Sequence, residues 1–275
     1  MDFAQISECT LRMRIKALEM ALHAGRNGAH IGGGFSSMEL LSTLFLGVMK
    51  YDLKDPASLK RDRFFMSKGH GVLAYYTALW QAGFLTEAEL DCFEKNGGDF
   101  PGHPVLNAQY GIETSSGSLG MGIGIAAGDA LAAKLNHQSY KCYVLLGDGE
   151  CDEGSVWESA MACRHYRLDN LIVLLDRNHI QSDDSCKKVM DLENIAQKWF
   201  AFGWDVISID GHNVEEIHRA LFTPVKNGHP RILIAETVKG KGVSFFENTA
   251  DWHHGVVTQE IYDRAIAELT GVSNV

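Results

Sequence analysis

One stretch of sequence decides the fold of this chain: Tyr143-Val144-Leu145-Leu146-Gly147-Asp148-Gly149-Glu150. Its apolar start is typical of a buried strand, and a second apolar run over residues 171–175 predicts a neighbouring strand that continues into Asp176-Arg177-Asn178. Thirty residues separate Asp148 from Asn178, which is the length of one strand–helix–strand unit. Both side chains are therefore expected at the carboxyl ends of neighbouring parallel strands, where ligands bind in open α/β sheets.

These strand ends predict a site for a metal ion and a diphosphate. A diphosphate carries about three negative charges, and a carboxylate about 4 Å away would be repelled by about 4 kcal/mol at an effective dielectric constant of about 20. Asp148 therefore implies a cation between the two groups. Mg²⁺ or Ca²⁺ fits best, because both prefer the oxygen ligands that Asp148, Asn178 and the carbonyl of Ile180 could supply. Gly-Asp-Gly alone is a common turn, so the prediction depends on the spacing and on the closing asparagine.

The rest of the chain alternates strands with helices. Further strands are expected over residues 204–209 and 232–235, and helices over residues 6–22 and 259–269. Helix starts are predicted where a capping residue precedes a glutamate by three positions, at Ser36, Thr86, Ser155 and Asn213. This order predicts a doubly wound α/β fold, with a mostly parallel sheet and helices on both of its faces.

Size and composition limit the class of protein. With 275 residues and 45% hydrophobic content, the chain can bury one large core, and a single domain over residues 1–275 is expected. No apolar run approaches about eighteen residues and the amino terminus lacks a signal-peptide pattern, so a cytoplasmic protein is expected. The six cysteines show no metal-ligand spacing and are expected to be reduced. A net charge of −10 argues against nucleic acid or a membrane as a partner.

Four histidines lie in loops rich in glycine or proline, at positions 30, 70, 103 and 254. Each one alone is more often a solvated or structural imidazole. As a group beside a diphosphate they suit a polyhydroxylated substrate, because imidazole can donate in either protonation state and can move protons near neutral pH. A fifth histidine, His212, stands at a helix start and is expected to be structural.

Together these motifs resemble the amino-terminal half of the transketolase family of thiamine diphosphate enzymes, over about residues 10–256. The resemblance implies that Mg²⁺ or Ca²⁺ is held by Asp148, Asn178 and the Ile180 carbonyl. It implies a diphosphate site formed by His70, Gly149, Asn178 and His254. The loop beneath the aminopyrimidine corresponds to Gly117, Ser118 and Leu119. Sugar binding and proton relay correspond to the catalytic residues His30, His103 and His254, and Glu153 resembles a carboxylate buried near the subunit contact.

Some features depart from the family pattern. Ala29-His30-Ile31 stands in place of Gly-His-Pro, Ser118 in place of proline, and Lys239-Gly240-Lys241-Gly242 is unusually basic. The second domain of the family does not follow residue 256. The resemblance therefore implies the first subunit of a split transketolase, paired with a separate carboxyl-half subunit in a two-plus-two heterotetramer. That enzyme would move a two-carbon ketol unit from a ketose phosphate to an aldose phosphate, in carbohydrate metabolism of the pentose phosphate type.

Three other functions stay open from the sequence. One is the alpha subunit of a 2-keto acid dehydrogenase, which the loops at His70 and His103 disfavour. Another is a relative of deoxyxylulose phosphate synthase, which the Lys-Gly-Lys-Gly stretch favours slightly. The third is a non-catalytic subunit that binds a nucleotide or a thiamine derivative through magnesium.

Overall fold

A five-stranded sheet forms the centre of the computed structural model, which describes residues 1–271. Its strands are β1 (Arg63–Met66), β2 (Cys142–Gly147), β3 (Leu171–Arg177), β4 (Asp205–Asp210) and β5 (Arg231–Glu236). They lie in the order β1-β2-β3-β5-β4, and every neighbouring pair is parallel. The parallel sheet confirms the predicted fold class, although the short edge strand β1 was not predicted.

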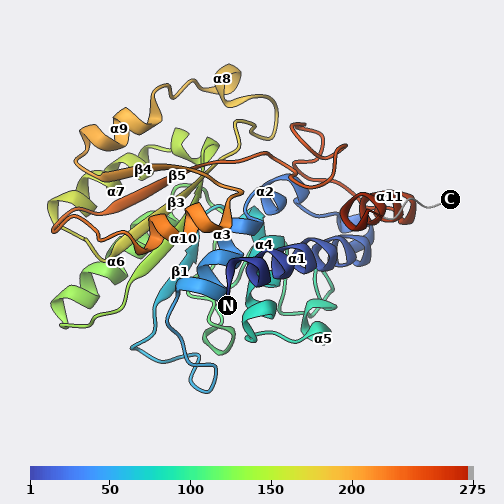
Figure 1. Cartoon of the computed structure of the whole chain (residues 1–275), viewed down its shortest axis with the longest axis horizontal. Helices are drawn as coiled ribbons and strands as arrows, with labels where there is room; N and C mark the ends of the chain where they lie inside the picture. Colours follow the sequence, from blue (N-terminus) through green and yellow to red (C-terminus); the bar gives the residue numbers. More distant parts are fainter. Residues whose placement is uncertain (272–275) are drawn as a thin grey trace.

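Both faces of the sheet are buried, because successive residues of a strand point to opposite faces. On β2, Tyr143 and Leu145 pack into one core, whereas Val144 and Leu146 pack into the other. The first core is covered by α1 (Phe3–Ala24), α3 (Met38–Thr43), α4 (Val72–Ala82) and α10 (Val214–Phe222). The second is covered by α6 (Gly122–Leu135), α7 (Gly154–His165) and α9 (Ile195–Ala201). Figure 1 shows the sheet between these two groups of helices.

Shorter elements fill the loops around the sheet. The helices are α2 (Ile31–Phe35), α5 (Glu87–Leu90) and α8 (Cys186–Val189), with single turns η1 (Gly25–Asn27), η2 (Leu44–Val48), η3 (Gly69–Gly71), η4 (Ala108–Tyr110) and η5 (Gly149–Asp152). The last helix, α11 (Gln259–Thr270), packs beside α1 (Figure 1). Across residues 1–271, every helix is too short or too polar to cross a membrane.

Two of the four predicted helix caps are confirmed, and two are wrong. Thr86 forms the predicted reciprocal box at the start of α5, and the Asn213 side chain caps α10. The predicted caps at Ser36 and Ser155 are wrong. Ser36 Oγ instead donates to a carboxylate oxygen of Asp176 at 2.6 Å, and Ser155 Oγ donates to a loop carbonyl at 3.0 Å. Both hydroxyls are used for tertiary contacts, which a local pattern does not reveal.

His212 has the structural role that was predicted for it. Its Nδ1 lies 3.0 Å from a carboxylate oxygen of Glu39, and its Nε2 accepts a hydrogen bond from the Val238 amide at 2.8 Å. The imidazole therefore ties the start of α10 to α3 and to the loop after β5.

Candidate functional site

Asp148 and Asn178 meet at the carboxyl edge of the sheet, directly after β2 and β3. Gly147 pairs in register with Asp176, and the Asp148 amide donates to the Asp176 carbonyl at 3.2 Å. Asp148, Gly149, Asn178 and Ile180 line one cavity of about 130 Å³. The structure thus brings together four residues that the sequence assigned to the metal and the diphosphate.

Among residues 1–271, no basic side chain forms an ion pair with the Asp148 carboxylate. It is 8% exposed and accepts hydrogen bonds from the backbone amides of Gly149 at 2.8 Å and His179 at 2.6 Å. Burial, followed by the nearby Asp176 carboxylate, raises the pKa of Asp148 above its usual value. A cation in the cavity would therefore be attracted to this carboxylate and would offset the cost of burying it.

The other predicted metal ligands are also oxygen atoms with fixed orientation. Asn178 Oδ1 accepts from the Ile180 amide at 3.2 Å, and the Ile180 carbonyl accepts from Lys239 Nζ at 2.8 Å. Within residues 1–271 no group of three His, Cys, Asp or Glu side chains is arranged to hold a metal. A metal at Asp148 would therefore need the amide and carbonyl oxygens together with oxygens of its ligand, which is the donor chemistry of Mg²⁺ and Ca²⁺.

Lys239 is a site residue that the sequence analysis noted only as a departure from the family pattern. Its ammonium group donates to the carbonyls of Ile180 at 2.8 Å and Gln181 at 2.9 Å. Burial, followed by the Lys68 charge, lowers the pKa of Lys239 to about 8. A positive charge therefore stands in the wall of the cavity, where it could attract an anion.

A buried ion pair lies beneath the cavity. Lys68 and Asp176 are 1% and 0% exposed, and the Lys68 ammonium donates to the Asp176 carboxylate and, at 2.7 Å, to the Gly33 carbonyl. Burial alone would raise the pKa of Asp176, but the Lys68 charge holds it below its usual value. Neither side chain was predicted as a site residue, although Lys68 directly precedes the Gly-His-Gly loop.

The predicted aminopyrimidine loop is tied to the sheet by Glu150. This carboxylate is 2% exposed and accepts from the Gly120 amide at 2.7 Å, from the Gly147 amide at 3.1 Å and from Ser67. Leu119 lines the cavity, whereas Gly117 and Ser118 line an adjoining groove. Glu150 was not predicted as a site residue, even though it completes the Gly-Asp-Gly-Glu motif.

Four imidazoles gather around that of His30 and form a cluster of five with it. Its ring centroid lies 5.5 Å from His70, 5.4 Å from His103, 5.5 Å from His253 and 4.5 Å from His254. Burial, followed by the charges of His254 and His253, lowers the pKa of His30 to about 3. The four predicted histidines are therefore neighbours, and the fifth, His253, was missed. His70 and His253 line the cavity of about 130 Å³ beside Asp148, whereas His254 is not among the residues that line it.

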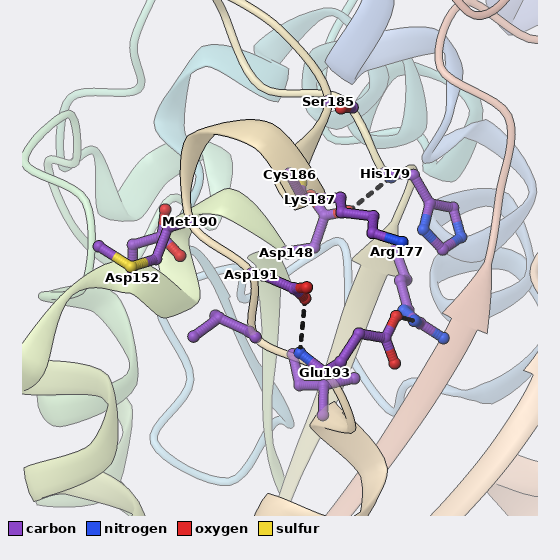
Figure 2. A pocket seen from close by; sticks show the side chains of 12 residues that line it. Asp148, Asp152, Arg177, His179, Ser185, Cys186, Lys187, Met190, Asp191 and Glu193 are labelled. Atoms are coloured by element: carbon purple, nitrogen blue, oxygen red, sulfur yellow. Dashed lines mark hydrogen bonds and ion pairs between the residues drawn. The ribbon is translucent and has the colours of Figure 1, made fainter.

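Asp148 also borders a second cavity, of about 180 Å³, which lies under the segment around α8. Figure 2 shows the His179 amide bonded to Asp148 and the Asp191 carboxylate bonded to the Glu193 amide. The Arg177 guanidinium pairs with carboxylates of Glu193 at 3.2 Å and Glu236 at 2.6 Å. The arginine that lines this cavity is thus already neutralised, unlike Lys239 in the first cavity.

Comparisons with known proteins agree with this geometry. A family model described as "Transketolase, thiamine diphosphate binding domain" matches residues 8–268. The chain is 40% identical over 269 residues to one of the subunits of the apulose-4-phosphate transketolase of Phocaeicola vulgatus, covering 94% of this chain and 95% of that protein. It is 41% identical over 241 residues to 6-deoxy-6-sulfo-D-fructose transketolase subunit SqwG of a Clostridium species, covering 87% and 88%.

A solved transketolase structure is also similar to this chain. The crystal structure of transketolase from Campylobacter jejuni superposes with a TM-score of 0.90 at 29% identity. The superposition covers 98% of this chain but 43% of that one, so the chain spans less than half the length of this longer transketolase. The chain therefore belongs to the transketolase family of transferases, and it carries the thiamine diphosphate-binding domain of that family.

Proposed function

We propose that this chain is the amino-terminal subunit of a two-chain transketolase that moves a two-carbon ketol unit from a ketose phosphate to an aldose phosphate. Two similar proteins that are named as transketolase subunits match it along 95% and 88% of their length. The longer Campylobacter enzyme continues well beyond the matched part. A second chain would supply the carboxyl half, the part of the longer enzyme that the match does not cover.

The observation that carries the proposal is the cavity around Asp148. A buried carboxylate without a basic partner, two oriented oxygens at Asn178 and Ile180, and the Lys239 ammonium face one space. In this proposal Mg²⁺, or Ca²⁺, binds to the three oxygens, and the diphosphate of the cofactor binds beside it. When bound, thiamine diphosphate supplies an electron sink for cleavage of the carbon–carbon bond of the donor.

The histidine cluster provides proton transfer and sugar binding in this proposal. His30 lies at its centre, and its lowered pKa of about 3 keeps the imidazole neutral near pH 7. A neutral imidazole carries one donor and one acceptor nitrogen, so it can pass a proton between substrate hydroxyl groups. His103 and His254 are exposed beside it and would contact the hydroxyl groups of the sugar.

The aminopyrimidine loop would complete the cofactor site. Leu119 lines the same cavity as Asp148, so its side chain is placed to contact the cofactor ring next to the diphosphate. Gly117 and Ser118 have no bulky side chains and line the adjoining groove, which would leave room for a flat ring. The Glu150 carboxylate would hold this loop at its distance from the metal ligands.

The proposed assembly is a heterotetramer of two such chains and two carboxyl-half subunits, with this chain acting as one cofactor-binding domain. Glu153 is exposed in the single chain and directly precedes α7, and we place it at the contact between subunits. All six cysteines are free, which suits a reducing cytoplasm, where sugar phosphates are also found.

The test is to isolate the chain with the protein that co-purifies with it and to supply thiamine diphosphate, Mg²⁺, a ketose phosphate and an aldose phosphate. Products that differ from the substrates by two carbons support the proposal. A D148A variant should lose both cofactor binding and transfer, since its metal ligand is gone. Bound cofactor with unchanged sugars would contradict the transfer and favour a non-catalytic binding subunit.

The family match favours a transketolase over a 2-keto acid dehydrogenase subunit. In a parallel assay with pyruvate as the donor, release of carbon dioxide without transfer would identify the dehydrogenase. Condensation of pyruvate with glyceraldehyde phosphate would identify the deoxyxylulose phosphate synthase reaction.

A further inference from the structure

Glu94 places a carboxylate without a partner at the open side of the histidine cluster. It lies between α5 and the loop over residues 101–104 that carries His103, and its side chain is half-buried. Within the part of the chain that the structure describes, no donor is hydrogen-bonded to this carboxylate and no basic group pairs with it. Charged groups that are partly buried are normally paired, so this one is available to a ligand.

The backbone of Glu94 is held in an uncommon conformation. Its φ is +55°, in the left-handed region that a residue with a side chain rarely adopts. The Glu94 amide donates to the Phe100 carbonyl at 3.0 Å, and the Glu94 carbonyl accepts from Asn27 Nδ2 at 2.9 Å. Asn27 lies in the same loop as His30, the centre of the histidine cluster, so this contact fixes Glu94 relative to the cluster. Strained residues that their surroundings hold in place occur preferentially at functional sites.

The carboxylate of Glu94 lies beside His103. The position that a Cβ atom would take at Gly102 is filled by Glu94 Oε1, so the carboxylate lies against the backbone directly before His103. The His103 side chain is exposed, and its ring centroid lies 5.4 Å from that of His30. Glu94 and His103 therefore lie side by side at the edge of the cluster.

The charge of Glu94 acts on the environment of His103. Burial lowers the pKa of His103, the Glu94 carboxylate opposes this shift, and the charge of His254 adds to it. His103 thus has an anion on one side and the imidazoles of His30 and His254 near it. A hydroxyl group bound here would meet a charged acceptor, whereas an anionic group would meet a like charge.

We propose that Glu94 is a specificity-determining residue: its carboxylate accepts a hydrogen bond from the hydroxyl group next to the aldehyde of the acceptor, and it excludes an anionic group from the same place. This inference rests on the proposed function and deepens it. The cavity beside Asp148 is the proposed place of the cofactor, so an acceptor reaches the site from the open side, where Glu94 lies. A phosphorylated aldose would bind with its phosphate directed away from Glu94.

The test uses two acceptors that differ in one substituent. Glycolaldehyde carries a hydroxyl group next to its aldehyde, and glyoxylate carries a carboxylate oxygen at the same place. The assembled enzyme is given one ketose phosphate donor, Mg²⁺ and thiamine diphosphate, and kcat/KM is measured for each acceptor. E94Q keeps the shape and an acceptor oxygen but removes the charge, so the ratio of kcat/KM for glycolaldehyde to that for glyoxylate should fall by about tenfold or more.

D99N is the matched control for this ratio. Asp99 is an exposed carboxylate of the same segment, and its charge acts on Tyr110. Because an exposed charge is screened by salt, D99N should keep the ratio within about twofold of that of the unaltered enzyme.

NMR titration of the full chain without its partner gives a second readout. The pKa of His103 should be lower in E94Q than in the unaltered chain, because the anion that favours the protonated imidazole is gone. The same pKa should stay unchanged in D99N. The signals of His103 are assigned by their absence from the spectrum of H103Q.

The possible failures are distinguishable. Transfer to both acceptors with an unchanged ratio in E94Q would overturn the specificity role and leave the proposed function in place. An unchanged pKa of His103 in E94Q would show that the carboxylate does not face this ring, and would overturn the role as well. No transfer to either acceptor by the unaltered assembly would overturn the proposed function and the role of Glu94 with it. Circular dichroism of each variant confirms that folded proteins are compared.

Discussion

Asn178 Nδ2 donates a hydrogen bond to Asp176 Oδ2 at 2.9 Å. An amide group has one donor end and one acceptor end, so this bond turns Asn178 Oδ1 toward the Ile180 amide and the cavity. Asp176 is in turn held by Lys68, Ser36 and Thr237. The orientation of a proposed metal ligand is therefore set by a buried carboxylate that would not itself bind the metal.

The first prediction concerns this buried carboxylate. D176N leaves the Lys68 ammonium buried without its partner, so we expect the free energy of unfolding to fall by about 3–5 kcal/mol. Urea unfolding of the isolated chain measures the change. D184N is the matched control, because Asp184 pairs with Lys188 at an exposed site and should cost less than about 1 kcal/mol. Similar losses in both variants would contradict a special role for the buried pair.

The second prediction concerns the pH dependence of stability. An unfolded histidine has a pKa of about 6.5, whereas burial lowers that of His30 to about 3 in the folded chain. Between these values the unfolded chain binds the extra proton, so the contribution of His30 to stability is present above about pH 6.5 and is lost as the pH falls. The slope from one such group is at most about 1.4 kcal/mol per pH unit.

Replacing His30 should therefore flatten the fall in stability at low pH. Denaturant unfolding of H30Q and the unaltered chain at intervals between pH 7 and pH 4 measures the difference in slope. H137Q, at an exposed histidine outside the cluster, serves as control and should keep the original slope. A steeper slope in H30Q would refute the assignment of a neutral His30.

The third prediction concerns Lys239 and anion binding. Its pKa of about 8 means that the ammonium loses its proton as the pH rises through this value, so magnesium pyrophosphate should bind more weakly above pH 8. K239M should bind weakly at every pH, since its side chain carries no charge. K239R should keep its charge and lose the pH dependence between pH 7 and pH 9. Calorimetry at several pH values distinguishes the three proteins, and an unchanged profile in K239M would exclude Lys239 as the titrating group.

The fourth prediction compares two glycines of one helix, α6. A Cβ atom at Gly122 would lie 2.7 Å from Ser67 Cα, so G122A should destabilise the chain by about 1–3 kcal/mol. A Cβ atom at Gly128 would meet nothing within 4 Å, so G128A should stabilise the isolated chain by about 0.5–1 kcal/mol through helix propensity. Thermal unfolding of the two variants should therefore shift Tm in opposite directions.

The sequence predicts the centre of the fold well, for a physical reason. β2 and β3 are continuous apolar runs because both faces of a parallel sheet are buried, and their short length favours a strand over a buried helix. β1 has only four residues, Arg63–Met66, and begins with an arginine, so its pattern is too short to separate from a loop. The α6 helix begins at Gly122, because the residues before it form the loop that Glu150 fixes through the Gly120 amide.

Site residues that stand at strand ends can be predicted from the sequence. Site residues that reach the cavity only through tertiary contacts cannot. Asp148 and Asn178 stand at strand ends, so their convergence follows from the topology. Lys239 reaches the cavity from after β5 to bond with the Ile180 carbonyl, a contact between residues that no local pattern connects. The sequence analysis named His254 and missed His253, which lines the cavity, because the directions of two adjacent side chains depend on the backbone of the folded chain.

The paired backbones of Ala29 and Gly255 have a consequence for synthesis of the protein. The first histidine loop is translated before β1, but the segment around Gly255 that holds it is translated after β5. A nascent polypeptide that ends before Trp252 lacks the carbonyl that holds Gly32 and also lacks His253, whose Nδ1 lies 3.0 Å from Lys239 Nζ. This side of the cavity is thus completed after every strand of the sheet has been translated, by contacts between segments far apart in the sequence, which are the slowest to form.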